Sequence, residues 1–162
     1  MKVRFLSALA ARCAQPHLAI GMALVAISMN AFAVLGGSEA SVQADRTHMQ
    51  ASLKITPKSA YTVHELTLPS GTIVREYAAN GTVFAVAWEG PWPPDLEQLM
   101  GSYFQTYHEA VLARSGNNRG RKPVNIELPG LVARMGGHPR FFKGHAYVPE
   151  QMPQGVKEEE IR

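Results

Sequence analysis

Three short segments in the middle of the chain carry the mixture of apolar, β-branched and aromatic residues that is typical of β-strands. Residues 61–68 (YTVHELTL) and 72–77 (TIVREY) are separated by the turn-forming Pro69-Ser70-Gly71. Asn80-Gly81, a strong signal for a two-residue hairpin, precedes the third segment at 82–88 (TVFAVAW). Because this third segment is apolar on both faces, we expect it at the centre of a sheet that is covered on both sides.

Two other segments repeat apolar residues at the spacing of an α-helix. The first covers residues 39–53 and predicts a short N-terminal helix. The second begins at Asp95, a suitable N-cap, with Gln98 as the return partner of a capping box, and its apolar face continues to Val111. Gly101 interrupts this second helix at a cost of ~1 kcal/mol relative to Ala, which indicates a local bend or a close neighbour.

The remaining pattern completes the predicted fold class. Residues 124–128, 131–135 and 140–148 are candidate strands. We therefore predict an α+β domain: an antiparallel β-meander sheet of four to six strands, one long amphipathic helix packed on a face, and the short N-terminal helix. Residues 149–162 contain two prolines and the run Lys157-Glu-Glu-Glu160, and we predict a loosely held tail there.

The start of the chain has a pattern of another kind. Three basic residues precede an unbroken run of apolar or small residues at 18–29, and Ala31-Phe32-Ala33 has small residues at both key positions of a cleavage site. This layout predicts a secretory signal peptide at residues 1–33, followed by a single domain at 34–162. The alternative is an uncleaved membrane anchor, but the apolar run at 18–29 has 12 residues, whereas a spanning helix needs about 20. We expect an exported protein without a stable membrane anchor after cleavage, and we favour the periplasm over the cell exterior.

The predicted signal peptide, or leader, also affects how the net charge and the single cysteine are interpreted. The chain has 16 lysines and arginines against 13 acids, and three of the basic residues, with none of the acids, lie in residues 1–33. The exported domain is therefore formally neutral, which gives no reason to expect a nucleic-acid partner. The only cysteine, Cys13, lies in the leader as well, so the exported domain has no disulfide and no thiolate ligand.

Four stretches, spread over nearly the whole exported domain, carry a family resemblance. They are Leu35-Gly36-Gly37, residues 70–77 (SGTIVREY), residues 83–104 with VFAVAWEGP, PDL and LMGSYF, and residues 144–149 (GHAYVP). Through them the chain resembles a family of bacterial exported proteins known as domain of unknown function 2844. The resemblance implies a small exported domain without an established activity, and it supplies no catalytic residues.

Motifs of metal and serine chemistry are missing from the sequence. None of the five histidines after residue 33 has H-E-x-x-H spacing, and there is no G-x-S-x-G motif. His138 and His145 meet only if their segments form a hairpin, and we expect neither a metal nor a cofactor. Arg75 and Glu76 are neighbours on one strand, so they point to opposite faces, and we interpret them as exposed cross-strand charges.

A few residues are candidates for surface binding. Trp88 and Trp92 flank the Gly-Pro connector, and we expect Trp88 to lock the connector against the helix while Trp92 stays near the surface. Arg119, Arg121 and Lys122 form a basic loop that is able to contact an acidic partner, or less favourably an anionic lipid or polymer. The alternative for these three residues is a solvated loop tip.

Two functional hypotheses follow from the sequence. The leading one is a non-enzymatic binding or accessory domain of the envelope, whose partner is an unknown envelope protein or glycan. The alternative is a small periplasmic hydrolase whose acid and base are distant in the sequence. Its candidate residues are Glu65, Glu76, His138 and His145.

Overall fold

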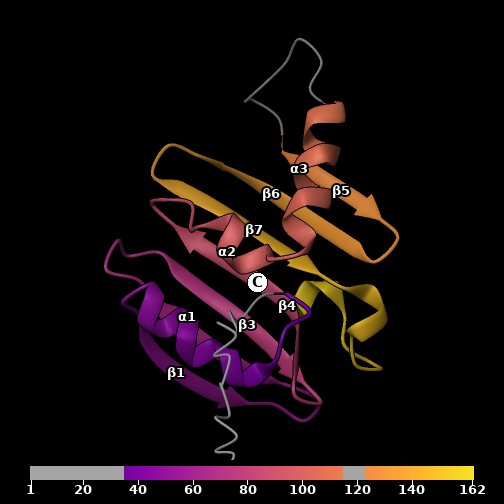
Figure 1. The fold of residues 1–162 in the computed structure, drawn as a ribbon. Coiled ribbons are helices and arrows are strands. Elements are labelled where there is room, and N and C mark those ends of the chain that lie inside the picture. Colours follow the sequence, from indigo (N-terminus) through magenta and orange to yellow (C-terminus); the bar gives the residue numbers. More distant parts are fainter. Residues whose placement is uncertain (1–34, 115–122) are drawn as a thin grey trace, which may run out of the picture.

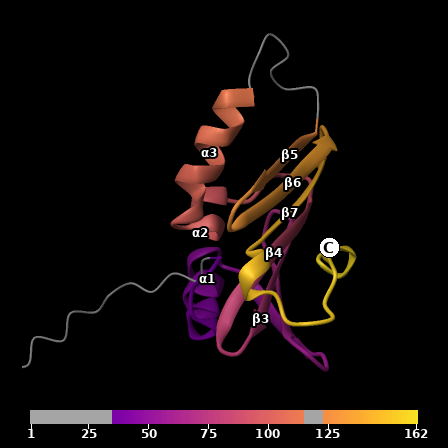
Figure 2. The same cartoon turned by 90° about the vertical axis from the view of Figure 1, so that its right-hand side faces the viewer.

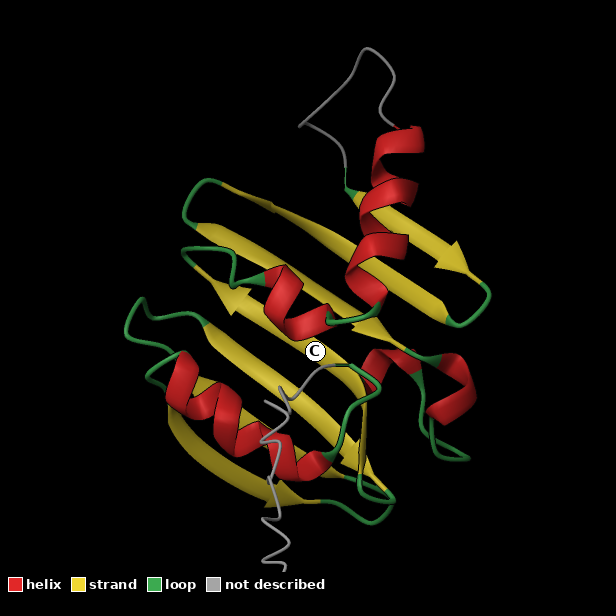
Figure 3. Cartoon of the chain, viewed as in Figure 1, coloured by secondary structure: helices red, strands yellow, loops and turns green. Residues whose placement is uncertain are grey.

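The computed structural model describes residues 35–114 and 123–162, and the predicted signal peptide at residues 1–33 lies outside these ranges. The chain forms an antiparallel sheet with helices on one face (Figures 1 and 3). The order of the strands is β1-β2-β3-β4-β7-β6-β5. Their bounds are β1 Ser52–Pro57, β2 Thr62–Thr67, β3 Ile73–Ala79, β4 Thr82–Gly90, β5 Val124–Leu128, β6 Leu131–His138 and β7 Phe141–Tyr147.

The sheet has seven strands, so the prediction of four to six was wrong, and the unpredicted strand is β1. The N-terminal helix ends at His48 rather than continuing to Leu53. The chain then reverses through Gln50, whose φ is 51°, and enters β1. Leu53, which had seemed to continue the helical spacing, lies opposite Leu66 of β2 instead.

The helical elements are η1 (Glu39–Ser41), α1 (Val42–His48), α2 (Leu96–Met100) and α3 (Tyr103–Arg114). The prediction of one long amphipathic helix was wrong, because that segment forms the two short helices α2 and α3. They are separated at Gly101, with φ 48° and ψ −121°. This conformation lies outside the helical region and is one that glycine adopts readily. The local bend that Gly101 indicated is therefore a complete break.

The predicted hairpin turn and N-cap agree with the structure, whereas the predicted capping box does not form. Asn80 and Gly81, with φ of 52° and 78°, connect β3 to β4 as the predicted two-residue hairpin. Asp95 caps α2, since its side chain accepts a hydrogen bond from the Gln98 backbone N–H at 3.1 Å. The Gln98 side chain does not complete a capping box; it donates to Asp45 of α1 at 2.6 Å.

The two faces of the sheet carry different layers. Figure 2 shows α1, α2 and α3 on one side of the sheet and the C-terminal segment on the other. Strand β4 lies in the middle of the strand order, as its apolar pattern predicted, and residues 83–88 are all buried. Val86 and Trp88 pack in the core beneath the helices, whereas Phe84, Ala85 and Ala87 belong to a second apolar cluster on the opposite face.

Two 3-10 turns, η2 (Pro149–Gln151) and η3 (Glu158–Glu160), belong to the C-terminal segment, residues 149–162, which follows β7. This segment runs over the face of the sheet that the helices leave open, hereafter the open face (Figure 2). Within residues 35–114 and 123–162, no helix has the length and apolar character needed to cross a membrane.

Candidate functional site

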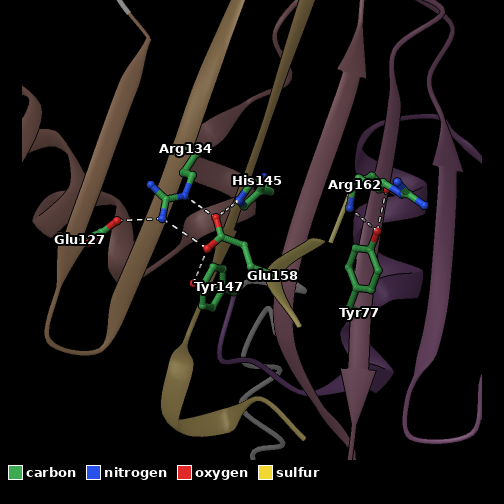
Figure 4. Close-up of polar contacts among 7 residues, drawn as sticks. All are labelled: Tyr77, Glu127, Arg134, His145, Tyr147, Glu158 and Arg162. Atoms are coloured by element: carbon green, nitrogen blue, oxygen red, sulfur yellow. Dashed lines mark hydrogen bonds and ion pairs between the residues drawn. The ribbon is translucent and has the colours of Figure 1, made fainter. Parts of the chain in front are cut away.

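Side chains from β6, β7 and the C-terminal segment meet on the open face (Figure 4). Arg134 donates through Nε and Nη2 to the carboxylate of Glu158, with 3.3 Å between Nη2 and Oε2. His145 Nε2 lies 3.0 Å from Oε1, and the Tyr147 hydroxyl donates to Oε2 at 3.0 Å. Three side chains thus bind both oxygens of one carboxylate, and we call Arg134, His145 and Tyr147 the carboxylate cradle.

The sheet itself holds the cradle together. Arg134 of β6 lies directly opposite His145 of β7 in the strand register. His145 and Tyr147 are two residues apart, so they project from the same face, and their rings stack with centroids 6.3 Å apart. Arg134 also donates to Glu127 of β5 at 2.8 Å, so one side of its guanidinium is held by a partner on the sheet.

The electrostatics of the cradle favour an ionised guest. Hydrogen bonds from Arg134, followed by those from His145 and Tyr147, together lower the pKa of Glu158 to about 2 against the opposing effect of partial burial. Burial and the adjacent Glu158 raise the pKa of the Tyr147 hydroxyl. At neutral pH, therefore, Glu158 is a charged acceptor and Tyr147 is a donor.

The C-terminal segment is attached to the sheet at a second place as well. Ile161 is 1% exposed and packs in the second apolar cluster, which includes Tyr77 and Phe84. The Tyr77 hydroxyl donates to the backbone O of Arg162 at 2.8 Å and lies 3.0 Å from its backbone N (Figure 4). The composition predicts a loosely held tail here, and in the structure this segment has both a polar and an apolar attachment.

A pocket of about 660 Å³ adjoins the cradle. The C-terminal segment forms one wall through Glu158, Glu159, Ile161 and Arg162, and strands β4 to β7, with the residue just before β5, form the rest. The other lining residues are Trp88, Glu89, Pro123, Asn125, Arg134, Met135, Gly136, Gly137, Lys143, Gly144 and His145. Charged and amide groups therefore dominate the polar part of a concave surface.

Gly144, which lines the pocket, leaves space for the buried indole ring of Trp88 on the neighbouring strand. Trp88 of β4 lies opposite Gly144 of β7, and a Cβ at position 144 would lie 2.5 Å from Trp88 Cζ2. Only a residue without a side chain allows the indole ring to lie this close to β7. Trp88 is 4% exposed, in agreement with the prediction that it has a packing role.

A second polar cluster lies beneath the helices and is closed to solvent. Asp45 of α1 and Glu76 of β3 are both 0% exposed. Burial first, and then the charge of the nearby Asp45, together raise the pKa of Glu76 to about 9. Nearby, His64 is buried and its Nε2 lies 2.8 Å from Glu39 Oε1. Within the described residues, no group of three or more His, Cys, Asp or Glu side chains is arranged to hold a metal ion.

A comparison with known protein families identifies the family of the chain. The model of the family described as "Protein of unknown function (DUF2844)" matches residues 31–161, which is most of the chain. The chain belongs to the DUF2844 family. No curated protein and no solved structure matches it. The resemblance that the sequence motifs indicated is thus confirmed, and the fold and pocket described above are those of a DUF2844 member.

The surface residues proposed from the sequence have different outcomes in this DUF2844 chain. Trp92 is 63% exposed, and its backbone O accepts a hydrogen bond from the Thr72 hydroxyl at 2.7 Å. Trp92 does not line the pocket. Arg119, Arg121 and Lys122 lie outside the described residues.

The four residues of the hydrolase hypothesis have separate surroundings in the structure. Glu65 forms an ion pair with Arg75 at 2.8 Å on the open face, whereas Glu76 is buried beneath the helices. His138 and His145 do lie on one hairpin, but the register pairs His138 with Phe141 at its turn and His145 with Arg134. Of the four, His145 alone lines the pocket.

The Arg75–Glu76 interpretation was half right. The two residues point to opposite faces, as alternation required, and Arg75 bridges Glu65 and Glu89, at 3.0 Å from the latter. The expectation that Glu76 is exposed was wrong, because α1 lies over this part of the sheet and brings Asp45 to Glu76 (Figure 1). A strand with one charge on each face does not tell which face is covered.

Sequence reasoning missed most of the cradle. From the sequence, Arg134 belongs to an apolar run, Tyr147 to a candidate hairpin strand, and Glu158 to a tail that we predicted to be loosely held. A weak signal was available, since His145 and Tyr147 stand at the i, i+2 spacing that places polar groups on one strand face. Their partner Glu158 comes from a segment whose composition gives no indication of its docking site.

Proposed function

We propose that this DUF2844 member is an exported envelope protein that works as a binding or accessory domain rather than as an enzyme. The signal-peptide pattern of residues 1–33 supports export, and the periplasm is the compartment we favour. The open-face pocket supports binding. Its volume of about 660 Å³ falls within the range of about 300–1,000 Å³ that is typical of ligand sites.

The single observation that carries the binding role is the convergence of hydrogen-bond donors in this pocket. Arg134 and His145 contact the carboxylate in the cradle, and Asn125 and Lys143 line the adjoining surface. Lys143 forms no ion pair with any of the described residues, so its charge is available to a ligand. A partner with acidic or polar groups, either an envelope protein or a glycan, suits such a surface.

The geometry favours binding over hydrolysis. His145 and Glu158 form an acid–base contact at 3.0 Å in the pocket. A general base needs a pKa near the working pH. The pKa of Glu158 is lowered to about 2, mainly by the hydrogen bonds from Arg134, so its carboxylate is a weak base that already has three donors. The contact is better suited to holding a charge than to moving a proton.

Thermal unfolding in the presence of envelope components tests the proposal. A ligand at about a hundred times its dissociation constant should stabilise the domain by about 2.7 kcal/mol. The shift should decrease in Lys143→Ala, which changes the pocket. It should persist in Lys54→Ala, a matched control on the edge strand β1, outside the pocket. If no envelope protein or glycan fraction shifts the unfolding temperature, or if both variants respond equally, the proposed function is wrong.

A further inference from the structure

We propose that the carboxylate cradle of Arg134, His145 and Tyr147 is a receptor site for an acidic peptide, which the chain's own C-terminal segment occupies and which a partner's acidic segment takes over. This inference rests on the proposed function and names the class of partner for the same pocket. Two observations carry it: the cradle is built by the sheet without help from its guest, and the guest is bound as a peptide.

The cradle is preorganised. Its members come from β6 and β7, where the register sets Arg134 against His145 and alternation sets Tyr147 beside it. The bond from Arg134 to Glu127 at 2.8 Å and the stacking of the His145 and Tyr147 rings do not involve the C-terminal segment. Departure of Glu158 would therefore leave three aligned donors on the surface. Such preorganised donors bind a carboxylate with little ordering cost.

The guest is recognised at three points that together describe a peptide. The first is the Glu158 carboxylate in the cradle, and the second is the side chain of Ile161, three positions later, in the second apolar cluster. The third is the backbone of Arg162, whose N and O both contact the Tyr77 hydroxyl. An acidic sugar offers a carboxylate but neither an aliphatic side chain nor a peptide group. The site thus favours a segment with a glutamate and an aliphatic residue three positions later.

The position of the C-terminal segment allows its replacement. The segment packs on the sheet with one side and lines the pocket of about 660 Å³ with the other, so a competing segment has room to enter next to it. The tethered segment competes at an effective concentration on the order of 1 mM, as short flexible connections do. A free peptide should consequently bind weakly to the unmodified chain and much better once the tethered carboxylate is removed.

The test uses the exported chain, from residue 34 onward, and a synthetic peptide with the sequence of residues 156–162. Titration is carried out on the unmodified chain and on Glu158→Gln, in which the tethered guest loses its charge. The peptide should bind Glu158→Gln about tenfold tighter or more, because a charged hydrogen-bonded group replaces a neutral one. Equal affinity for the two chains, or no binding to Glu158→Gln at about 1 mM peptide, overturns the inference.

Three controls fix the site and the class of ligand. Adding Arg134→Gln to Glu158→Gln should abolish the gain, whereas adding Arg75→Gln should not. Arg75 is a matched control, since it too bridges two glutamates on the open face but lies outside the pocket. A peptide with glutamine in place of Glu158 should not bind Glu158→Gln more tightly than it binds the unmodified chain. Glucuronate that binds the cradle while the peptide does not would overturn the peptide class.

A second measurement covers the case in which Glu158→Gln does not fold. In the unmodified chain, saturating peptide should accelerate amide hydrogen exchange in residues 150–162, and unchanged exchange there contradicts replacement. The outcome is distinguishable from failure of the proposed function. If envelope fractions stabilise the chain through Lys143 but neither peptide measurement responds, the acidic-peptide inference falls and the binding role stands. If nothing stabilises the chain, the binding role falls by its own test.

Discussion

Glu76 of β3 and Asp45 of α1 are both fully buried and face each other beneath the helices, where the pKa of Glu76 is raised to about 9. The Gln98 side chain of α2 donates to Asp45 at 2.6 Å and stabilises its negative charge. Two neighbouring carboxylates that are both buried away from water do not both ionise, because burial and mutual repulsion disfavour the second charge. Glu76 therefore keeps its proton at neutral pH. The two side chains thus lie buried beneath the helices with Glu76 in its neutral form.

This proton makes stability depend on pH in a definite direction. The pKa of Glu76 is about 9 in the folded chain and has its ordinary value of 4.5 when unfolded. The folded state therefore binds a proton that the unfolded state releases, and the stability contributed by Glu76 is complete below pH 4.5 and is lost as the pH rises toward 9. Glu76→Gln has a neutral side chain of the same shape that does not titrate. Its free energy of unfolding relative to wild type should therefore increase by up to about 1.4 kcal/mol per pH unit in this window.

Urea unfolding at pH 5, 7 and 8.5 measures this gain. The difference between Glu76→Gln and wild type should grow with pH. Glu65→Gln is a suitable control, because it removes a carboxylate from the neighbouring strand β2 on the solvent side, where Glu65 is paired with Arg75. Parallel stability curves for wild type and Glu76→Gln would show that Glu76 is not the buried proton carrier.

The Glu76–Asp45 pair also shows where sequence reasoning stops. The centre of the sheet was predictable, because β4 is apolar on both faces, and so was the Asn80-Gly81 turn, because it is a local signal. The burial of Glu76 was not predictable, since it depends on Asp45, which lies on a helix far away in the sequence. In the same way, Leu53 fits a helix by spacing but belongs to β1, because the chain reverses at Gln50 without a glycine to mark the turn.

The cradle predicts the opposite dependence on pH. The pKa of Glu158 is lowered to about 2 in the folded chain, so its stabilising contribution is present above its ordinary pKa of 4.5 and is lost as the pH falls toward 2. Glu158→Gln should cost about 1–2 kcal/mol at pH 7, because the site is partly exposed and screened, and almost nothing near pH 2.

Denaturant unfolding at pH 7 and near pH 2.5 tests the contribution of Glu158. Glu127→Gln is the matched control: Glu127 binds the same Arg134, but its side chain is 67% exposed. We expect that variant to remain within about 0.5 kcal/mol of wild type at both pH values. A loss in Glu158→Gln that is equally large at low pH would mean that packing, and not charge, holds the segment.

The apolar attachment of the C-terminal segment can be tested separately from the cradle. Ile161 is 1% exposed, so Ile161→Ala should destabilise the domain by about 2–4 kcal/mol. The loss is smaller if the segment relaxes into the space that the side chain leaves. Amide exchange should accelerate in residues 149–162 before it does in β4. The exposed Ile55, at 53%, provides the control, since Ile55→Ala should have little effect. Equal effects of the two substitutions would place Ile161 in solvent.

The break between α2 and α3 gives a prediction whose sign decides between two folds. In a continuous helix, Gly101→Ala would stabilise the chain by about 1 kcal/mol, since alanine is the better helix former. Gly101 instead has φ 48° and ψ −121°, which alanine reaches only with strain, so Gly101→Ala should destabilise by about 1–3 kcal/mol. Thr106→Ala, at an exposed position within α3, should be neutral or stabilising by a few tenths of a kcal/mol. Thermal unfolding of both variants is sufficient, and a stabilising Gly101→Ala would restore the single long helix that the apolar spacing predicted.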